Sequence, residues 1–240
     1  MTLNLRQGIK DGLAIGLGYL SVSFSFGILA VDCGLSWWQA VLISLTNLTS
    51  AGQVAAVGIM GAPMVSLSAG MFEMALSTFI INIRYSLMGI SLSQKTDETM
   101  TTPARLVTGF VITDEIFGVA VSRPKVSRNY MLGLGVLPII GWTLGTLLGA
   151  VCGSILPAFV TASLAIGIYG MFVAIVLPAS RKDKGVALVS IIAIILSVIL
   201  YYVPFLKEHI SGGFAVIICA VIAAIIGAFT LPAKEEEING

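Results

Sequence analysis

Three short polar clusters interrupt the long apolar stretches of this sequence, and they carry the side chains that could do chemistry. Arginine can anchor a carboxylate, a carboxylate can accept an ammonium group or a proton, and amides and hydroxyls can complete a hydrogen-bonding site. We predict that nine residues of these clusters bind a small zwitterionic substrate: Asn47, Ser50, Gly52, Gln53, Asn82, Arg84, Tyr85, Asp114 and Glu115.

The first cluster, residues 46–53, lies in the middle of an apolar stretch and weakens a helix there. Its Ser, Thr and Asn side chains compete for backbone hydrogen bonds, and its glycine adds flexibility. The sequence therefore predicts a helix interruption around Thr49–Gln53, where free backbone groups hold the charged ends of a substrate. The alternative is a continuous helix whose hydroxyls bond back to their own carbonyls.

The second cluster surrounds Arg84. An arginine in an apolar stretch is an anion anchor, a structural partner of a carboxylate, or a residue that reaches back to the membrane surface. The apolar sequence SLMGISL continues beyond it, which disfavours the third interpretation.

The third cluster contains the adjacent carboxylates Asp114 and Glu115. Two neighbouring carboxylates cannot both ionise cheaply in a low dielectric, which predicts a proton or cation relay, or a counter-charge for an amine. The alternative is a structural ion pair with Arg84. We expect Arg84 and Asp114 to lie at one depth and to pair, leaving Glu115 to bind a proton or a substrate amine.

The composition indicates a membrane protein. Hydrophobic residues make up 57% of the 240 residues and charged residues only 10%, too few to cover a soluble protein of this size. A net charge of +1 excludes a polybasic nucleic-acid binder. The three cysteines lie far apart and indicate neither a disulfide framework nor a zinc site.

We predict an all-α, polytopic fold in a single integral membrane domain, residues 1–240, with a short N-terminus and an acidic C-terminal tail. A membrane-crossing helix needs about 20 apolar residues. Eight candidate spans follow: approximately 12–31, 37–59, 64–92, 105–122, 130–155, 160–178, 185–204 and 212–231. Because 105–122 is short and holds both carboxylates of the third cluster, seven spans are the alternative.

Basic residues favour eight spans with both termini on the cytoplasmic side of the cell membrane. In that arrangement, nine basic residues lie inside: Arg6, Lys10, Arg123, Lys125, Arg128, Arg181, Lys182, Lys184 and Lys234. Only Lys95, Arg105 and Lys207 lie outside.

Glycines recur at every fourth position in two places, at residues 8–16 and at residues 141–153. This spacing predicts close packing of helix backbones, either within the chain or, for the second ladder, against a separate small membrane subunit. A possible internal repeat relates GLGY (16–19) to GLGV (133–136) and AVDCG (30–34) to AVCGS (150–154), which would match segments 1–3 to segments 5–7.

Motifs of enzymes are missing. The sequence has no G-x-x-x-x-G-K-[ST], H-E-x-x-H or G-x-S-x-G motif, and its one histidine, His209, lies in a loop. We therefore expect no enzymatic activity, no cofactor and no metal.

The order of SAGQ (50–53), NIRY (82–85) and TDE (113–115) resembles the AzlC family, the large subunits of two-component branched-chain amino-acid exporters. The resemblance implies a hydrophobic amino acid as substrate and a small AzlD-type membrane subunit as partner. Tyr85 stands where the resemblance leads us to expect a histidine in many relatives.

We therefore predict a secondary transporter subunit that exports branched-chain or similar hydrophobic amino acids, driven by an ion gradient or by exchange. A channel or pore-forming subunit is the alternative, although no repeated acidic motif favours it. A purely structural membrane subunit is a third possibility, disfavoured by the cost of burying three charged residues.

Overall fold

The computed structural model describes residues 4–62, 66–153, 155–157, 159, 170, 173, 176–178, 180–181 and 183–230. These residues form helices and no strand. Five helices are long and apolar enough to cross a membrane: α1 (Leu5–Asp32), α4 (Leu67–Ser93), α7 (Arg128–Cys152), α9 (Lys184–Tyr202) and α11 (Gly212–Thr230). The predicted all-α, polytopic class is confirmed. The predicted span 160–178 lies largely outside the described residues.

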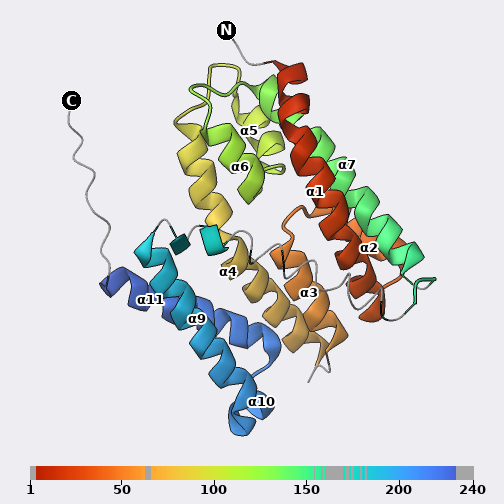
Figure 1. The fold of residues 1–240 in the computed structure, drawn as a ribbon, viewed down its shortest axis with the longest axis vertical. Coiled ribbons are helices and arrows are strands. Elements are labelled where there is room, and N and C mark those ends of the chain that lie inside the picture. Colours follow the sequence, from red (N-terminus) through yellow and green to blue (C-terminus); the bar gives the residue numbers. More distant parts are fainter. Residues whose placement is uncertain are drawn as a thin grey trace.

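The fold is organised around a parallel pair of helices, α1 and α7, which run side by side from the same end of the molecule (Figure 1). Both glycine ladders lie in the interface of this pair, the first against residues 130–138 of α7 and the second against residues 16–28 of α1. A Cβ atom added at Gly141 would overlap the Gly16 carbonyl, and one added at Gly145 would overlap the Leu20 carbonyl. The prediction that the second ladder packs within the chain is confirmed. Because α1 covers this face, a separate small membrane subunit does not bind there.

The segment after α1 folds as a helical hairpin, which we call the first hairpin. It consists of α2 (Trp37–Thr46) and α3 (Ala51–Gly61). The chain enters and leaves it at the same end, because Gly61 lies against Cys33, directly after α1. Val57 and Ala40 likewise pack into one cluster from opposite arms. Arms of 10 and 11 residues reach about 15 Å, half of the hydrocarbon layer.

The segment between α4 and α7 folds as a second hairpin, which enters from the opposite end. It consists of α5 (Thr102–Gly109) and α6 (Asp114–Val121). The strand-like bridge between Thr96 and Val126 joins the chain before this hairpin to the chain after it. Lys95 Nζ donates to the Val121 carbonyl over 2.6 Å, which fixes the end of α6 beside the end of α4.

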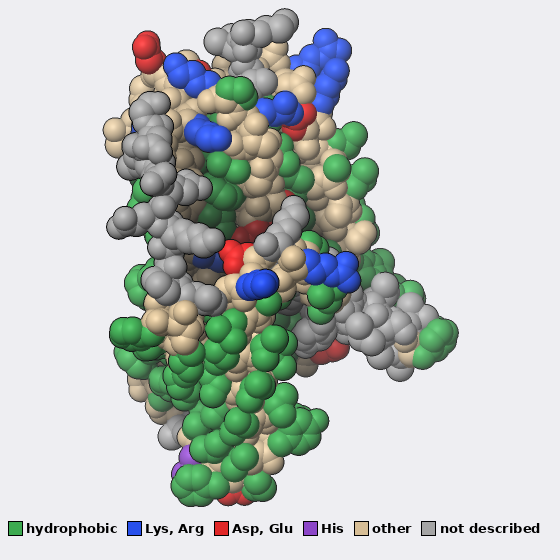
Figure 2. Space-filling model, turned by 60° about the vertical axis from the view of Figure 1, so that its left-hand side comes forward, with side chains coloured by type: hydrophobic (Ala, Val, Ile, Leu, Met, Phe, Trp, Pro, Cys, Tyr) green, Lys and Arg blue, Asp and Glu red, His purple; other side chains and the backbone are tan. Residues whose placement is uncertain are grey.

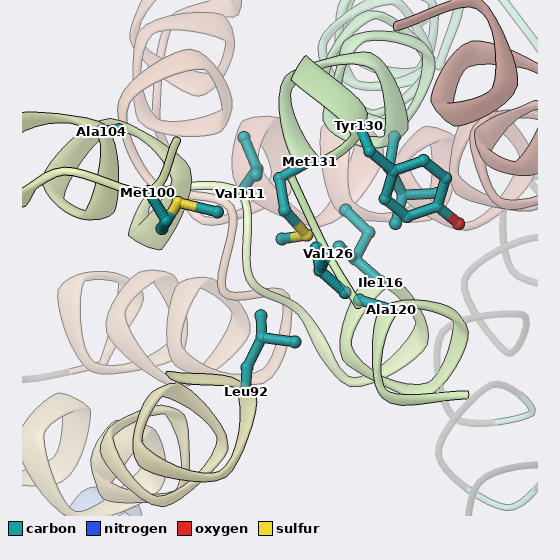
Figure 3. Close-up of a cluster of buried hydrophobic side chains, with 10 residues drawn as sticks. Leu92, Met100, Ala104, Val111, Ile116, Ala120, Val126, Tyr130 and Met131 are labelled. Atoms are coloured by element: carbon teal, nitrogen blue, oxygen red, sulfur yellow. The ribbon is translucent and has the colours of Figure 1, made fainter. Parts of the chain in front are cut away.

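Buried apolar side chains hold the second hairpin against the end of α4 and the start of α7 (Figure 3). The cluster comprises Leu92, Met100, Ala104, Val111, Ile116, Ala120, Val126, Tyr130, Met131 and Leu134. Because it draws on both arms of the hairpin and on both neighbouring helices, the hairpin cannot move without disturbing this core.

Two of the eight predicted spans therefore do not cross the molecule. Segments 37–59 and 105–122 each turn back at about half depth, and both ends of each hairpin lie at one end of the fold. Hydropathy counts apolar residues but does not report direction, which is set here by contacts such as that of Gly61 with Cys33. The eight-span prediction is thus wrong in both segments, whereas the seven-span alternative is confirmed for 105–122 and wrong for 37–59.

The repeated unit in the structure is a long helix followed by a half-depth hairpin. It occurs as α1 with the first hairpin and again as α4 with the second hairpin, and α4 runs in the direction opposite to α1 (Figure 1). This differs from the repeat predicted from the sequence, whose matching segments lie on α1 and on α7 and its C-terminal end. Inverted units of this kind are a common way to build transporters.

Basic residues gather at the end where α1 begins, which we call the basic end (Figure 2). Between residues 4 and 153, all of them except Arg84 lie there: Arg6, Lys10, Lys95, Arg105, Arg123, Lys125 and Arg128. Lys95 and Arg105 were predicted on the opposite side. They join the others because the second hairpin returns to the end from which it entered.

The remaining described helices form an antiparallel arm. Helices α9 and α11 are connected through α10 (Pro204–His209) and pack on each other where Val189 meets Gly227. This arm joins the body through Glu73 of α4, whose Oε1 accepts a hydrogen bond of 2.9 Å from the Gly213 amide.

Candidate functional site

The tips of the two hairpins meet between α1 and α4, far from both ends of these helices. The first tip is residues 47–50, and the second is residues 110–113. Both tips contact Tyr19 of α1: Leu48 packs with it, and the Thr113 hydroxyl lies 2.6 Å from its hydroxyl. The predicted helix interruption is confirmed, beginning two residues earlier than expected.

Arg84 of α4 pairs with Asp114 at the start of α6. Arg84 Nη2 lies 3.0 Å from Asp114 Oδ2, and the side chains retain 39% and 26% of their exposure. The predicted contact is thus confirmed. An ion pair at this depth lowers the cost of burying both charges, and its partial exposure leaves room for a polar ligand.

Tyr85 connects the ion pair to the first hairpin. Arg84 Nη2 donates to the Tyr85 hydroxyl over 3.3 Å, and the guanidinium carbon lies 5.1 Å from the centre of the Tyr85 ring. The Tyr85 hydroxyl in turn donates to the Thr49 carbonyl over 3.5 Å. Arg84 and Tyr85 therefore bridge the tips of both hairpins.

Glu115 is held by a residue that the sequence analysis missed. The hydroxyl of Tyr19, buried in α1, donates to Glu115 Oε2 over 2.5 Å. One signal in the sequence could have found it, since a tyrosine in the middle of an apolar span needs a polar partner for its hydroxyl. Glu115 and Asp114 thus point to different helices, as expected for adjacent residues of one helix.

The first tip is strained and packs on Asn82 of α4. Ser50 has φ 38°, and it is the one non-glycine residue with positive φ in the described part of the chain. Such backbone is costly and persists where the surroundings require it. Gly52 lies against the Asn82 amide, so that a Cβ atom there would lie 3.0 Å from Asn82 Nδ2.

Several buried polar atoms around the first hairpin have no hydrogen-bond partner among the described residues. They are Thr49 Oγ1, Gln53 Oε1, Asn82 Oδ1, Arg84 Nε and Trp142 Nε1. Buried polar atoms in proteins are nearly always paired, so a concentration of unpaired ones marks a place for a ligand or water.

The structure does not bring all nine predicted residues together. Gln53 is fully buried, and its amide lies 3.4 Å from the hydroxyl of Ser44, which shares a hydrogen bond with Thr146 of α7. No interaction in the described part of the chain joins Gln53 to Arg84. Asn47 is the C-cap of α2 and lines a groove instead.

This groove, of about 600 Å³, lies between the first hairpin and α4. Asn47, Thr46, Asn82 and Ser86 supply its polar lining, and residues such as Ile43, Met74, Phe79 and Ile83 supply its apolar lining. A largely apolar groove with a few polar groups beside a charged pair is typical of sites for small molecules. In the described residues, no group of His, Cys, Asp and Glu is arranged to hold a metal.

Long apolar helices, two opposed hairpins and a charged pair between their tips define a polytopic membrane protein with a buried polar centre. The model of the AzlC protein family matches residues 14–156, which include both hairpins and the charged pair. The chain belongs to the AzlC family.

Relatives with similar sequences are membrane proteins. The inner membrane protein YgaZ of Escherichia coli is 27% identical over 96% of this chain and 93% of its own length. An uncharacterized membrane protein of Archaeoglobus fulgidus is 29% identical over 72% of this chain and 74% of its own. One from Helicobacter pylori is 24% identical over 62% of this chain and 64% of its own. No solved structure matches the chain.

Proposed function

We propose that this protein is a secondary transporter subunit that exports branched-chain or similar hydrophobic amino acids. The observation that carries this proposal is the pair of Arg84 and Asp114 at the meeting point of two half-depth hairpins. Its membership of the AzlC family supports the proposal. No enzymatic step is required for this role.

A zwitterionic substrate suits this ion pair because it carries one group of each charge. The substrate carboxylate takes the place of Asp114 beside Arg84, and the substrate ammonium takes the place of Arg84 beside Asp114. Thr49 Oγ1 and Asn82 Oδ1, both buried and without a hydrogen-bond partner among the described residues, offer further acceptors for the ammonium group. The exchange keeps every buried charge compensated, which is the main energetic requirement at this depth.

The apolar side chain of the substrate fits the groove beside the first hairpin. Ile43, Met74 and Phe79 line it, and its volume of about 600 Å³ exceeds the needs of a branched-chain residue. Specificity for hydrophobic amino acids follows, because a charged or strongly polar side chain would lose hydration in this groove without gaining a partner.

The basic end faces the cytoplasm in this proposal, as the distribution of basic residues favours. The protein lies in the cytoplasmic membrane and works with a small AzlD-type membrane subunit. Because the sequence has no nucleotide-phosphate loop, energy comes from an ion gradient or from exchange.

The test is transport in proteoliposomes that contain the protein alone or together with a small AzlD-type membrane subunit. We expect saturable, stereoselective flux of L-leucine, L-isoleucine and L-valine, with little flux of lysine or glutamate. Arg84→Ala should abolish this flux, whereas Arg6→Ala, an exposed arginine at the basic end, should leave it unchanged.

Unsaturable flux without stereoselectivity would instead support a pore-forming subunit. Full flux in well-folded Arg84→Ala protein would contradict the assignment of the site. Equal flux with and without the small subunit would contradict the proposed partner.

A further inference from the structure

Two grooves approach the charged pair along α4, one from each side. The groove beside the first hairpin extends from Met60 and Met74 to Asn82 and Ser86. A second groove, of about 210 Å³, lies between α4 and the second hairpin. It begins among residues of the basic end, including Thr96 and Arg105, and ends at Tyr85 and Ile112.

Tyr85 and Arg84 separate the two grooves. Tyr85 lines the second groove, while its neighbours Ile83 and Ser86 line the first. On one side the Tyr85 hydroxyl reaches the Thr49 carbonyl at the first tip, and on the other Arg84 reaches Asp114 at the second tip. The Arg84 guanidinium also contacts the Tyr85 ring, so that the two side chains form one continuous barrier from the first tip to the second.

We propose that Tyr85 is the gate between these grooves. Its ring blocks the path between them, and its hydroxyl ties the gate to the first hairpin. The physiological meaning of the gate rests on the proposed transport function, since a transporter must never open its site to both sides at once. The geometry of the gate can be tested without any substrate.

The asymmetry of the two attachments indicates how the gate opens. The bond of Tyr85 to Thr49 is long, at 3.5 Å, whereas Arg84 and Asp114 approach to 3.0 Å with opposite charges. The weaker attachment is the one that breaks first. The larger groove lies on the weaker side, in agreement with a first hairpin that is easier to displace than the second.

The experiment measures the sidedness of thiol labelling. Cys33, Cys152 and Cys219 are replaced by serine, and a single reporter is introduced as Thr78→Cys in the first groove or Ser93→Cys in the second. These reporters lie about two helical turns before and after Tyr85 on α4. A membrane-impermeant maleimide is then added to right-side-out or inside-out vesicles.

With Tyr85 intact, we expect each reporter to react from one side only, and the two reporters from opposite sides. Tyr85→Ala should abolish this sidedness, so that both reporters react from both sides. Tyr85→Phe, which keeps the ring, should retain it. Leu87→Ala is the control, because Leu87 lies two residues after Tyr85 on α4, is exposed and lines neither groove, and it should also retain sidedness.

The proposal is overturned if Tyr85→Ala keeps full sidedness, if Leu87→Ala loses it to the same extent, or if both reporters react from one side in the parent protein. Loss of sidedness in Tyr85→Ala alone supports it. If this pattern holds while no amino acid is transported, the gate stands and the proposed substrate class fails.

Discussion

The two hairpins resemble each other in length and in position, but they differ in how completely their polar groups are paired. In the second hairpin, Thr113 caps α6 by accepting from the Ile116 amide, and Glu115 is held by Tyr19. At the basic end, Arg105 donates to the Met100 carbonyl over 3.1 Å. Beside the end of this hairpin, Arg123 pairs with Asp11 of α1 over 2.6 Å.

The first hairpin occupies the equivalent position with fewer such bonds. Ser50, the N-cap of α3, makes no side-chain cap hydrogen bond. Among the described residues, the Thr49 hydroxyl and the side-chain carbonyl oxygen of Gln53 have no hydrogen-bond partner. Its tip includes the strained residue Ser50. The larger groove runs along this hairpin.

This difference indicates which hairpin supports the site and which one responds to a ligand. Paired polar groups and a buried core fix the second hairpin, so it presents Asp114 as a stable counter-charge. Unpaired groups raise the free energy of the first hairpin until a ligand or a movement satisfies them. We infer that the first hairpin binds the ligand and moves, and that the second hairpin is a rigid support.

The largest expected effect comes from breaking the helix pair on which both hairpins rest. Gly145→Leu would place a side chain where the Leu20 carbonyl and the Ser23 hydroxyl already lie. We expect a loss of about 3 kcal/mol in stability, because α1 and α7 must separate. Thermal unfolding in detergent measures it. Gly18→Leu is the control and should unfold like the parent, because no atom of the described residues lies within 4 Å of a Cβ atom added there.

The next largest effect on stability distinguishes the two hairpin tips. Tyr19→Phe removes the hydrogen bond to Glu115 and should destabilise the second hairpin by about 2 kcal/mol, as expected for a bond to a charged group. Tyr85→Phe removes two long bonds, one from Arg84 Nη2 over 3.3 Å and one to the Thr49 carbonyl over 3.5 Å, and should cost about 1 kcal/mol or less. Equal losses in thermal unfolding would contradict the difference between the hairpins.

Much of this arrangement follows from the sequence. Arg84 and Asp114 were expected to pair because a charge within a span needs a partner, and they do so. The helix interruption was expected from the Ser, Thr and Asn side chains of residues 46–53, and α2 ends at Thr46. In both cases the requirement is local and can be recognised from residue types.

The hairpins were not predictable in the same way. Residues 37–59 contain enough apolar side chains for a complete span, and nothing in their order shows that Gly61 returns to Cys33. The partner of Glu115 was also missed, because Tyr19 lies ninety-six positions away in the chain. Direction and distant pairing depend on tertiary contacts, which a single sequence does not display.

Substitutions of Thr49 and Thr113 test the difference between the two hairpins, because we expect them to change stability in opposite directions. Thr49→Val removes a buried hydroxyl that has no hydrogen-bond partner in the described part of the chain, and it should raise stability by about 1 kcal/mol while lowering export. Thr113→Val removes a helix cap and should lower stability by about 1 kcal/mol. Unfolding and transport are measured on both variants, and two changes of the same sign would refute the contrast.

The smallest effect concerns backbone strain in the first tip. Ser50→Gly should stabilise the protein by about 0.5 kcal/mol, since glycine adopts positive φ without a steric cost. Ser50→Ala keeps the strain and should bring no such gain. Differential scanning calorimetry of both variants distinguishes relief of backbone strain from loss of the hydroxyl.

Arg84 and Asp114 are proposed to bind the two ends of a zwitterion, and binding measurements that combine truncated ligands with substitutions of these residues test this role directly. Binding to purified protein is measured for leucine, for leucinamide, which lacks the carboxylate, and for 4-methylpentanoate, which lacks the ammonium group. We expect Arg84→Gln to weaken leucine binding about tenfold or more, to the level of leucinamide, while leaving leucinamide binding unchanged. Asp114→Asn should do the same for leucine and 4-methylpentanoate. If either variant weakens the intact and the truncated ligand by the same factor, or binds leucine as tightly as the parent does, the charged pair is not the binding site.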